Sequence, residues 1–343
     1  AQIAMGDALA VSLMQMRGFT SVDFARLHPG GSLGRRLLMT VGNVMRSHDL
    51  PVVAPDCSAT DMIHAISKGG LGLIIICDGE RIEGIVTDGD VRGMTDKIRD
   101  FFRITGDSPS EPLARKPSAE QLEWSAKVAA AQEKLVKKFN LGALAYYYHG
   151  AEGTEYETLQ KGFIVGFSLL TAAGVPCAGE GDLKTAIAMK ICDTLGVGGS
   201  FCEIVTTDYD DGTILLGHDG PFHIQIAEGK PILREMGLYH GKRGAGISVE
   251  AKVRRGDVTN LGLTQTGDGK LKLIISEGVS TDGKIMTIGN TQTPVRFPTD
   301  PDTYMETWFA EAPTHHFAMS VGKNAALFEK VAKLLDVQYI VLS

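Results

Sequence analysis

The sequence of 343 residues is poor in several features that mark particular classes of protein. No apolar run approaches the length of a transmembrane helix, so we expect no membrane span. The net charge is −7 at pH 7, which predicts no basic surface for nucleic acid or for an anionic membrane. The apolar N-terminal stretch has no basic leader, so we expect no signal peptide and a cytoplasmic location.

Cysteine is also scarce, and the five cysteines stand in no spacing typical of a metal site. Cys177, Cys192 and Cys202 lie among small apolar residues, where we expect them to be reduced and buried. The first residue is alanine instead of methionine, so we expect a chain that starts within a longer protein or has been processed. The length predicts two or three domains with ordinary cores.

Against this background, the stretch from Cys177 to His223 is rich in glycine and in candidate metal ligands. These candidates are Glu180, Glu203, His218 and His223. A second histidine pair, His315-His316, follows near the C-terminus. Two carboxylates with one or two imidazoles suit a divalent ion such as Mn²⁺. The alternative interpretation is that they are surface carboxylates and scattered loop histidines.

An ordered series of motifs in residues 94–343 resembles the C-terminal part of an L-arabinose isomerase-like protein of the L-fucose/L-arabinose isomerase superfamily. The motifs include GALAYYYHG, AGEGDLKTAIAMK, GGSFCEI, LLGHDGPFH, YHGKRGAGISVE, IGNTQT and PTHHFAMSVG. The resemblance implies a Mn²⁺-dependent aldose–ketose isomerase. By motif, Glu180 and Glu203 match positions that bind the metal, and we expect them also to act as the acid/base pair. His218 and His316 match the other two ligands, with His223 as the alternative to His218.

Three further polar residues are candidates for contacts with a free sugar such as L-arabinose or L-fucose. They are His315, Lys242 and Asn290. Lys242 is equally compatible with a solvated basic loop. In the superfamily a neighbouring subunit completes the pocket, so the resemblance also implies a homo-oligomer and leaves open whether this chain is active alone.

Residues 1–93 resemble a different protein, the D-arabinose 5-phosphate isomerases. Residues 1–42 match the tail of the sugar-isomerase (SIS) domain, in which the histidine of the HPGG loop is catalytic; here that residue is His28. We favour a loop histidine instead, because the other catalytic residues of that domain are missing and a lone imidazole has no partner to set its pKa.

Residues 43–93 resemble one CBS motif, the regulatory module of the same isomerases. Thr87 and Asp90 are candidates for holding a nucleotide, as in paired CBS motifs. The sequence contains one such motif, so a second chain would have to complete the site. The alternative interpretation is that acidic residues here cap the helix that begins near Val91.

The fold class that we expect is α/β plus β, in four segments. They are an SIS-tail-like helix and loop at 1–42, a CBS-like α/β module at 43–93, a partial open α/β sheet at 94–198, and an antiparallel β-barrel of the fucose/arabinose isomerase C-terminal type with C-terminal helices at 199–343. From Gly199 the hydrophobic period changes to two, in seven stretches that include FHIQIAE. We expect Trp308 and Phe309 to pack the segment that carries His315-His316.

Because the resemblance changes near residues 92–96, we expect the chain to be a fusion or two incomplete pieces numbered continuously. Three functions therefore stay open. The first is a metal-dependent isomerase of a free sugar. The second is a fragment of a sugar-phosphate (D-arabinose 5-phosphate) isomerase, and the third is a CBS-type nucleotide-sensing module without catalysis.

Overall fold

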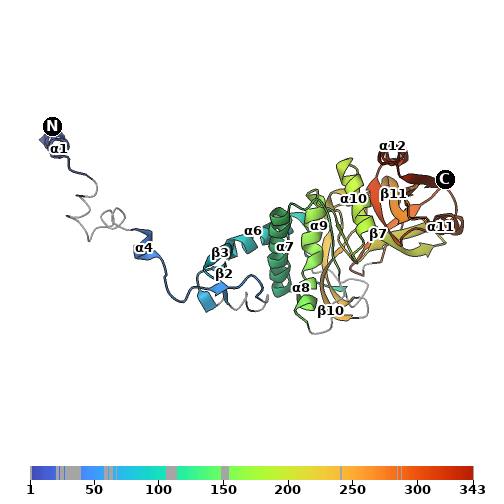
Figure 1. The fold of residues 1–343 in the computed structure, drawn as a ribbon, viewed down its shortest axis with the longest axis horizontal. Coiled ribbons are helices and arrows are strands. Elements are labelled where there is room, and N and C mark those ends of the chain that lie inside the picture. Colours follow the sequence, from blue (N-terminus) through green and yellow to red (C-terminus); the bar gives the residue numbers. More distant parts are fainter. Residues whose placement is uncertain are drawn as a thin grey trace. The chain divides into compact units, whose positions relative to one another are not determined.

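A computed structural model describes residues 2–20, 23, 27, 40–57, 61, 65, 66, 68–105, 114–147, 154–239, 242–283, 285, 286 and 288–342. The chain divides into two compact units, which are coloured along the sequence in Figure 1. The N-terminal unit comprises residues 1–56 and 62–85, and the C-terminal unit comprises residues 57–61 and 86–343. No helix in these described ranges is long and apolar enough to cross a membrane.

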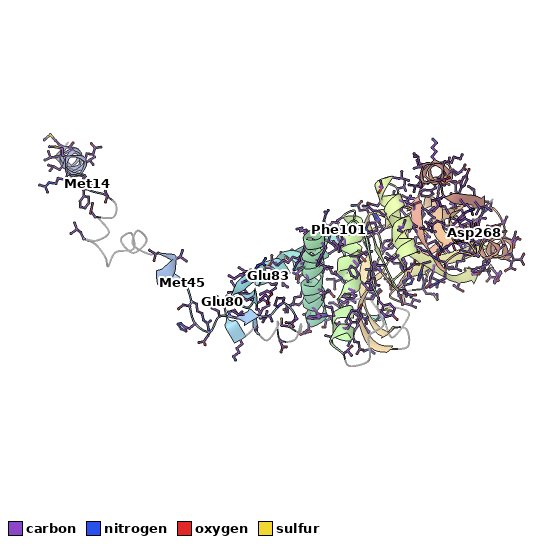
Figure 2. The ribbon with its side chains drawn as sticks, in the orientation of Figure 1. Met14, Met45, Glu80, Glu83, Phe101 and Asp268 are labelled. Atoms are coloured by element: carbon purple, nitrogen blue, oxygen red, sulfur yellow. The ribbon has the colours of Figure 1, made fainter. Side chains whose placement is uncertain are left out.

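The N-terminal unit contains a small sheet with the strand order β1-β2-β3. Its described elements are α1 (Gln2–Met16), α4 (Val41–Val44), β1 (Val52–Val53), β2 (Leu73–Asp78) and β3 (Arg81–Thr87). The apolar run Leu73–Asp78 forms β2, and Gly79 takes a φ of +60° in the turn to β3. Glu80 and Glu83 mark this turn and strand in Figure 2.

The helical part of the C-terminal unit begins with α6 (Asp88–Phe101), which packs against α7 (Ala119–Phe139). Met94 and Ile98 of α6 belong to the main hydrophobic core. The expected boundary between residues 93 and 94 thus falls inside one continuous helix, and the compact units divide at Val86 instead. Ser118 and Gln121 form a capping box at the start of α7.

A two-stranded parallel sheet and three helices lead from α7 to the barrel. The strands are β5 (Leu144–Ala145) and β6 (Cys177–Ala178), and the helices are α8 (Glu155–Gln160), α9 (Phe163–Ala172) and α10 (Leu183–Thr194). A short β4 (Ala114–Arg115) instead joins the antiparallel pair β9 (Ile232–Tyr239) and β10 (Lys242–Glu250) in a separate sheet.

Six antiparallel strands close on themselves to form a barrel. Their spatial order is β11 (Gly256–Gln265), β14 (His316–Val321), β7 (Gly198–Asp208), β8 (Thr213–His218), β13 (Thr291–Arg296) and β12 (Leu271–Ser280), which pairs again with β11. A seventh strand, β15 (Gln338–Leu342), runs parallel to β12. The helices α11 (Pro301–Ala310) and α12 (Ala325–Leu335) flank β14 in the sequence.

Two expectations about local structure are wrong. The stretch FHIQIAE does not form a strand: it contains a 3-10 helix, η1 (Ile224–Ile226), whose two isoleucines are buried. Phe309 is 56% exposed, whereas Trp308 is 1% exposed and packs edge-on against Phe317 of β14. Consecutive residues of a helix point about 100° apart, so only one of the two aromatic rings can face the barrel.

Replacing Trp308 by alanine should lower the free energy of unfolding by about 3–5 kcal/mol, because the change leaves a cavity beneath β14. The matched control, Phe309→Ala on the same helix, should change it by less than about 0.5 kcal/mol. Urea unfolding followed by far-UV circular dichroism measures both. Equal losses in the two variants would contradict this packing.

Candidate metal centre

The candidate metal centre lies where three neighbouring barrel strands bring polar side chains to one level. His316 of β14 pairs with Glu203 of β7, and Glu203 pairs on its other side with Gly217 of β8. His218 follows Gly217 and ends β8. Residues more than 100 positions apart in the sequence are thus neighbours because of strand register alone.

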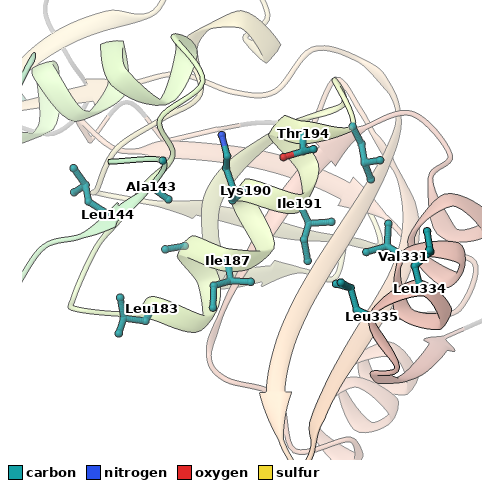
Figure 3. A pocket seen from close by; sticks show the side chains of 13 residues that line it. Ala143, Leu144, Leu183, Ile187, Lys190, Ile191, Thr194, Val331, Leu334 and Leu335 are labelled. Atoms are coloured by element: carbon teal, nitrogen blue, oxygen red, sulfur yellow. The ribbon is translucent and has the colours of Figure 1, made fainter. Parts of the chain in front are cut away.

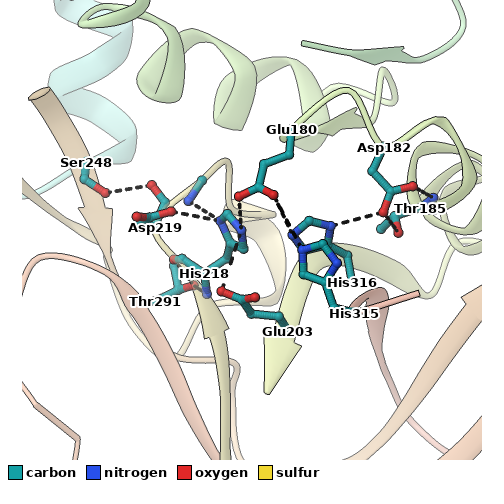
Figure 4. A network of polar contacts seen from close by, with 11 residues as sticks. Glu180, Asp182, Thr185, Glu203, His218, Asp219, Ser248, Thr291, His315 and His316 are labelled. Atoms are coloured by element: carbon teal, nitrogen blue, oxygen red, sulfur yellow. Dashed lines mark hydrogen bonds and ion pairs between the residues drawn. The ribbon is translucent and has the colours of Figure 1, made fainter. Parts of the chain in front are cut away.

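Glu180 reaches the same place from the tight turn between β6 and α10. Its φ is +56°, in the left-handed region that is uncommon for residues other than glycine. Gly181 follows at φ +70°, and its N–H donates to the carbonyl of Tyr146 at 2.8 Å. A side chain at Gly179 would lie 2.8 Å from the ring of Phe201. The turn is therefore held tightly, and Figure 4 shows Glu180 directed at the histidines.

The carboxylate of Glu180 faces the histidines with both oxygens. Its Oε1 lies 3.7 Å from Nε2 of His218, and its Oε2 lies 3.6 Å from Nε2 of His316 and 3.5 Å from Nε2 of His315. Glu203 Oε1 lies 3.8 Å from Nε2 of His218. Ligand atoms that each stand about 2.0–2.2 Å from one ion are separated by roughly these distances.

Two overlapping groups of these side chains have the spacing needed to hold an ion: Glu180 with His315 and His316, and Glu203 with His218 and His316. His316 is shared by both. Its side chain is 1% exposed, and its Nε2 is buried without a hydrogen-bond partner. Leaving such an atom unpaired costs about 1–3 kcal/mol, and a bound cation would satisfy it. The donor set and this orphaned nitrogen fit a divalent cation.

The charges of the centre are coupled. The imidazole of His218 beside Glu180 lowers the pKa of this carboxyl to about 2, against the opposing effect of burial. Burial lowers the pKa of the His218 imidazole, but the neighbouring carboxylates of Asp219 and Glu180 outweigh burial and raise that pKa to about 9. Glu180 is therefore ionised at neutral pH and suited to bind a cation.

Two aspartates of the centre were missed in the sequence. Asp182 Oδ2 lies 3.1 Å from Nδ1 of His316, and Asp219 Oδ1 lies 3.1 Å from Nδ1 of His218. Burial raises the pKa of Asp182, but hydrogen bonds from His316 and Thr185 outweigh it and hold that pKa at about 2. Proximity in sequence was the available signal, since each aspartate follows a predicted ligand within two positions.

The residues predicted to contact a substrate differ in their location and exposure. His315 lies at the centre with its side chain 67% exposed. Asn290 directly precedes Thr291, whose hydroxyl donates to the carbonyl of His218 at 2.8 Å. The Oδ1 of Asn290 is buried and has no hydrogen-bond partner. Lys242 opens β10, and its side chain lies outside the described residues, as does the whole of His28.

His223, the alternative ligand, belongs to neither group of side chains that could hold an ion in the described part of the chain. It is buried, and its backbone N–H donates to the hydroxyl of Ser200 at 3.2 Å. Between the two histidines, the structure therefore brings His218 to the centre.

Thr87 and Asp90, the nucleotide candidates, form a capping box at the start of α6. The Thr87 hydroxyl accepts from the N–H of Asp90, and the Asp90 carboxylate accepts from the N–H of Thr87, both at 3.1 Å. Lys134 of α7 also donates to Asp90 at 3.0 Å and lowers the pKa of that carboxyl. The capping interpretation accounts for both side chains, and nucleotide binding stays a prediction.

A cavity of about 680 Å³ lies apart from these polar groups, against α10 and the end of α12 (Figure 3). Its lining is almost wholly apolar, with Leu183, Ile187 and Leu334 among the side chains. Lys190 also lines it, but its ammonium group donates to the Gly174 carbonyl and to Asp193. The candidate acid/base and ligand groups therefore lie at the candidate metal centre, and none of them lines this cavity.

Comparisons with known proteins relate part of the chain to sugar-phosphate isomerases. No protein-family model matches. Arabinose 5-phosphate isomerase KdsD of Yersinia pestis is 50% identical over 98 residues, which cover 28% of this chain and 30% of the relative. Arabinose 5-phosphate isomerase GutQ of Escherichia coli O6:H1 is 38% identical over 138 residues, covering 38% of this chain and 43% of the relative.

A probable arabinose 5-phosphate isomerase of Haemophilus influenzae is 47% identical over 90 residues, covering 26% of each chain. The chain thus spans less than half the length of these curated relatives. Their names agree with the resemblance expected for residues 1–93. None of these three relatives is an isomerase of the L-fucose/L-arabinose superfamily that we expected for residues 94–343.

Acid should destabilise the protein in part through His223, whose pKa is lowered by burial. The unfolded chain binds a proton at this histidine near pH 6.5, but the folded chain resists it, so stability is lost as the pH falls through 6.5. His223→Gln should therefore lose less stability between pH 7.5 and 5.5 than the wild type, by about 1 kcal/mol.

Urea unfolding at the two pH values measures the difference. His48→Gln, at an exposed histidine, is the control and should follow the wild type. A His223→Gln protein that loses as much stability as the wild type in acid would show that burial of His223 does not oppose its protonation.

Proposed function

We propose that the C-terminal unit binds one Mn²⁺ or another divalent cation and catalyses aldose–ketose isomerisation of a free sugar. The observation that carries the proposal is the buried, unpaired Nε2 of His316, which faces the ionised carboxylate of Glu180. Glu203 and His218 complete the ligand set. The names of the relatives, which are isomerases of a sugar phosphate, support the broad reaction class.

The reaction moves a proton between two neighbouring carbons of the sugar and another between their oxygens. A bound divalent cation would supply electrostatic stabilisation of the negative charge that develops on those oxygens. The described side chains must then orient the sugar and carry the protons. His315, which is exposed beside Glu180, is available to donate to a sugar hydroxyl.

The two glutamates are suited to different tasks. Glu180 has a pKa of about 2, which makes its carboxylate a good ligand but a weak base, since an effective base has a pKa closer to the working pH. The carboxylate of Glu203 lies 3.8 Å from Nε2 of His218, and its side chain is 35% exposed, which makes it accessible to a bound sugar. Both glutamates would bind the cation, and we assign the transfer of the carbon-bound proton to Glu203.

A second candidate function is isomerisation of D-arabinose 5-phosphate, and the relatives favour it. Their matched regions reach 50% sequence identity, which is far higher than the identity that two proteins need in order to share a fold. His28 is the residue of this chain that would take part. The metal-dependent function remains our main proposal for the C-terminal unit because side chains that could hold an ion lie together there, whereas the relatives are matched over less than half of their length.

The nucleotide-sensing module is the remaining alternative, for which Thr87 and Asp90 would have to leave their capping box. The free-sugar proposal further includes a homo-oligomer, because in the resembling superfamily a second subunit completes the sugar pocket. Sedimentation of the intact chain measures this state directly.

Titration of the chain with Mn²⁺ in a calorimeter tests the main proposal. We expect one bound ion per chain and at least 100-fold weaker binding in the double variant Glu180→Gln/Glu203→Gln, because two anionic ligands become neutral amides. The matched control is Glu306→Gln at an exposed position of α11, which should bind Mn²⁺ as the wild type does.

Parallel assays with L-arabinose, L-fucose and D-arabinose 5-phosphate separate the two candidate reactions. The main proposal predicts turnover of a free sugar that chelation abolishes and Mn²⁺ restores. Turnover of D-arabinose 5-phosphate alone, unaffected by chelation and by the double substitution, would contradict it and support the second candidate.

A further inference from the structure

Two aspartates contact the histidines of the metal centre on the side away from the candidate cation (Figure 4). We propose that Asp182 and Asp219 are positioning residues that fix the imidazole tautomers, so that each Nε2 presents a lone pair to the cation. The inference rests on the proposed function of this centre, and it assigns to the two carboxylates a role other than ligation or proton transfer.

The carboxylate of Asp182, which is itself held by hydrogen bonds, holds the His316 ring in one tautomer. Asp182 Oδ2 lies 3.1 Å from Nδ1 of His316, while the N–H and hydroxyl of Thr185 donate to Asp182 at 2.9 and 2.7 Å. An ionised carboxylate can only accept, so Nδ1 carries the hydrogen. The buried Nε2 of His316 is then left with a lone pair and no donor. This is the arrangement by which a carboxylate orients a metal-binding histidine.

Two neighbours of the His218 ring require opposite protonation of its Nδ1 atom. The N–H of Gly220 lies 2.8 Å from Nδ1, and Oδ1 of Asp219 lies 3.1 Å from it. Gly220 can donate only to a bare Nδ1, whereas Asp219 can accept only from a protonated one. In the neutral ring, which binding of a cation requires, the bond to Asp219 leaves a lone pair on Nε2, whereas the bond to Gly220 places the hydrogen on Nε2.

The two histidines therefore differ in how firmly their neighbours fix the tautomer that binds a cation. The tautomer of His316 is fixed by a hydrogen bond with no competitor for Nδ1 among the described residues, while that of His218 depends on Asp219 prevailing over a backbone amide. Phe201 packs against both rings, with centroids 4.5 Å from His218 and 4.4 Å from His316. Packing restrains the ring planes, and the aspartates decide which nitrogen faces the cation.

Asp182→Asn inverts one hydrogen bond and leaves the helix cap in place. Asp182 is the N-cap of α10, and asparagine caps a helix as well as aspartate does. Its amide nitrogen would donate to Nδ1 of His316 and force the hydrogen onto Nε2. We expect the tautomer of His316 to switch and Mn²⁺ affinity to fall 10- to 100-fold. Asp219→Asn should likewise place the hydrogen of His218 on Nε2.

The experiment records ¹⁵N–¹H spectra of histidine-labelled, cation-free protein above pH 9, where the His218 ring is neutral. These spectra distinguish the two tautomers, and Mn²⁺ titration accompanies them. Asp193→Asn on α10, where the aspartate pairs with Lys190, is the matched control and should change neither readout. Thermal unfolding of each variant confirms that the cap and fold are retained. Asp182→Ser, which keeps a capping oxygen but is too short to reach His316, should weaken Mn²⁺ binding less than Asp182→Asn.

A His316 that keeps the hydrogen on Nδ1 in Asp182→Asn, with unchanged Mn²⁺ affinity, would overturn the proposal. If the wild type binds no Mn²⁺, the proposed function fails, but the spectra of the cation-free proteins still decide whether the aspartates set the tautomers. An unchanged tautomer in that case would overturn the positioning role as well.

Discussion

The pairing register of β14, β7 and β8 is the constraint on which the candidate site depends. It sets His316 opposite Glu203 and Glu203 opposite Gly217, with His218 as the next residue. A slip of one residue would move every side chain of a strand to its other face. Barrel closure through β11, β12 and β13 fixes this register from both sides. The chemistry of the site is thus a consequence of how the barrel closes.

Glu180 comes from a turn outside the barrel strands, and the conformation of this turn places its carboxylate beside the histidines that the register brings together. It occupies a left-handed backbone conformation between two glycines, at a turn that the adjoining Phe201 ring leaves little room to change. Strained backbone of this kind persists where the surrounding structure determines it, and such positions cluster at functional sites. The result is an ionised carboxylate placed between two buried imidazoles.

The sequence predicted the candidate ligands of this site better than their surroundings. Motifs singled out Glu180, Glu203, His218 and His316, which the structure brings together. Asp182 and Asp219 escaped notice because no periodic pattern shows which side chain an aspartate contacts: Asp182 contacts His316, 134 positions away, and Asp219 contacts the adjacent His218. Alternation predicted most barrel strands but misled at FHIQIAE, where a 3-10 turn buries Ile224 and Ile226 with the same spacing as a strand. Trp308 and Phe309 show the same limit, since adjacent aromatic residues do not reveal which one faces the core.

The most direct test of the central claim is anomalous diffraction from crystals soaked in Mn²⁺. We expect one strong peak per chain at the centre, about 2.0–2.3 Å from carboxylate oxygens of Glu180 and Glu203 and from Nε2 of His218 and His316. A peak at another place, or none at a concentration that saturates Mn²⁺ binding in solution, would contradict the assignment of these four residues as the ligands.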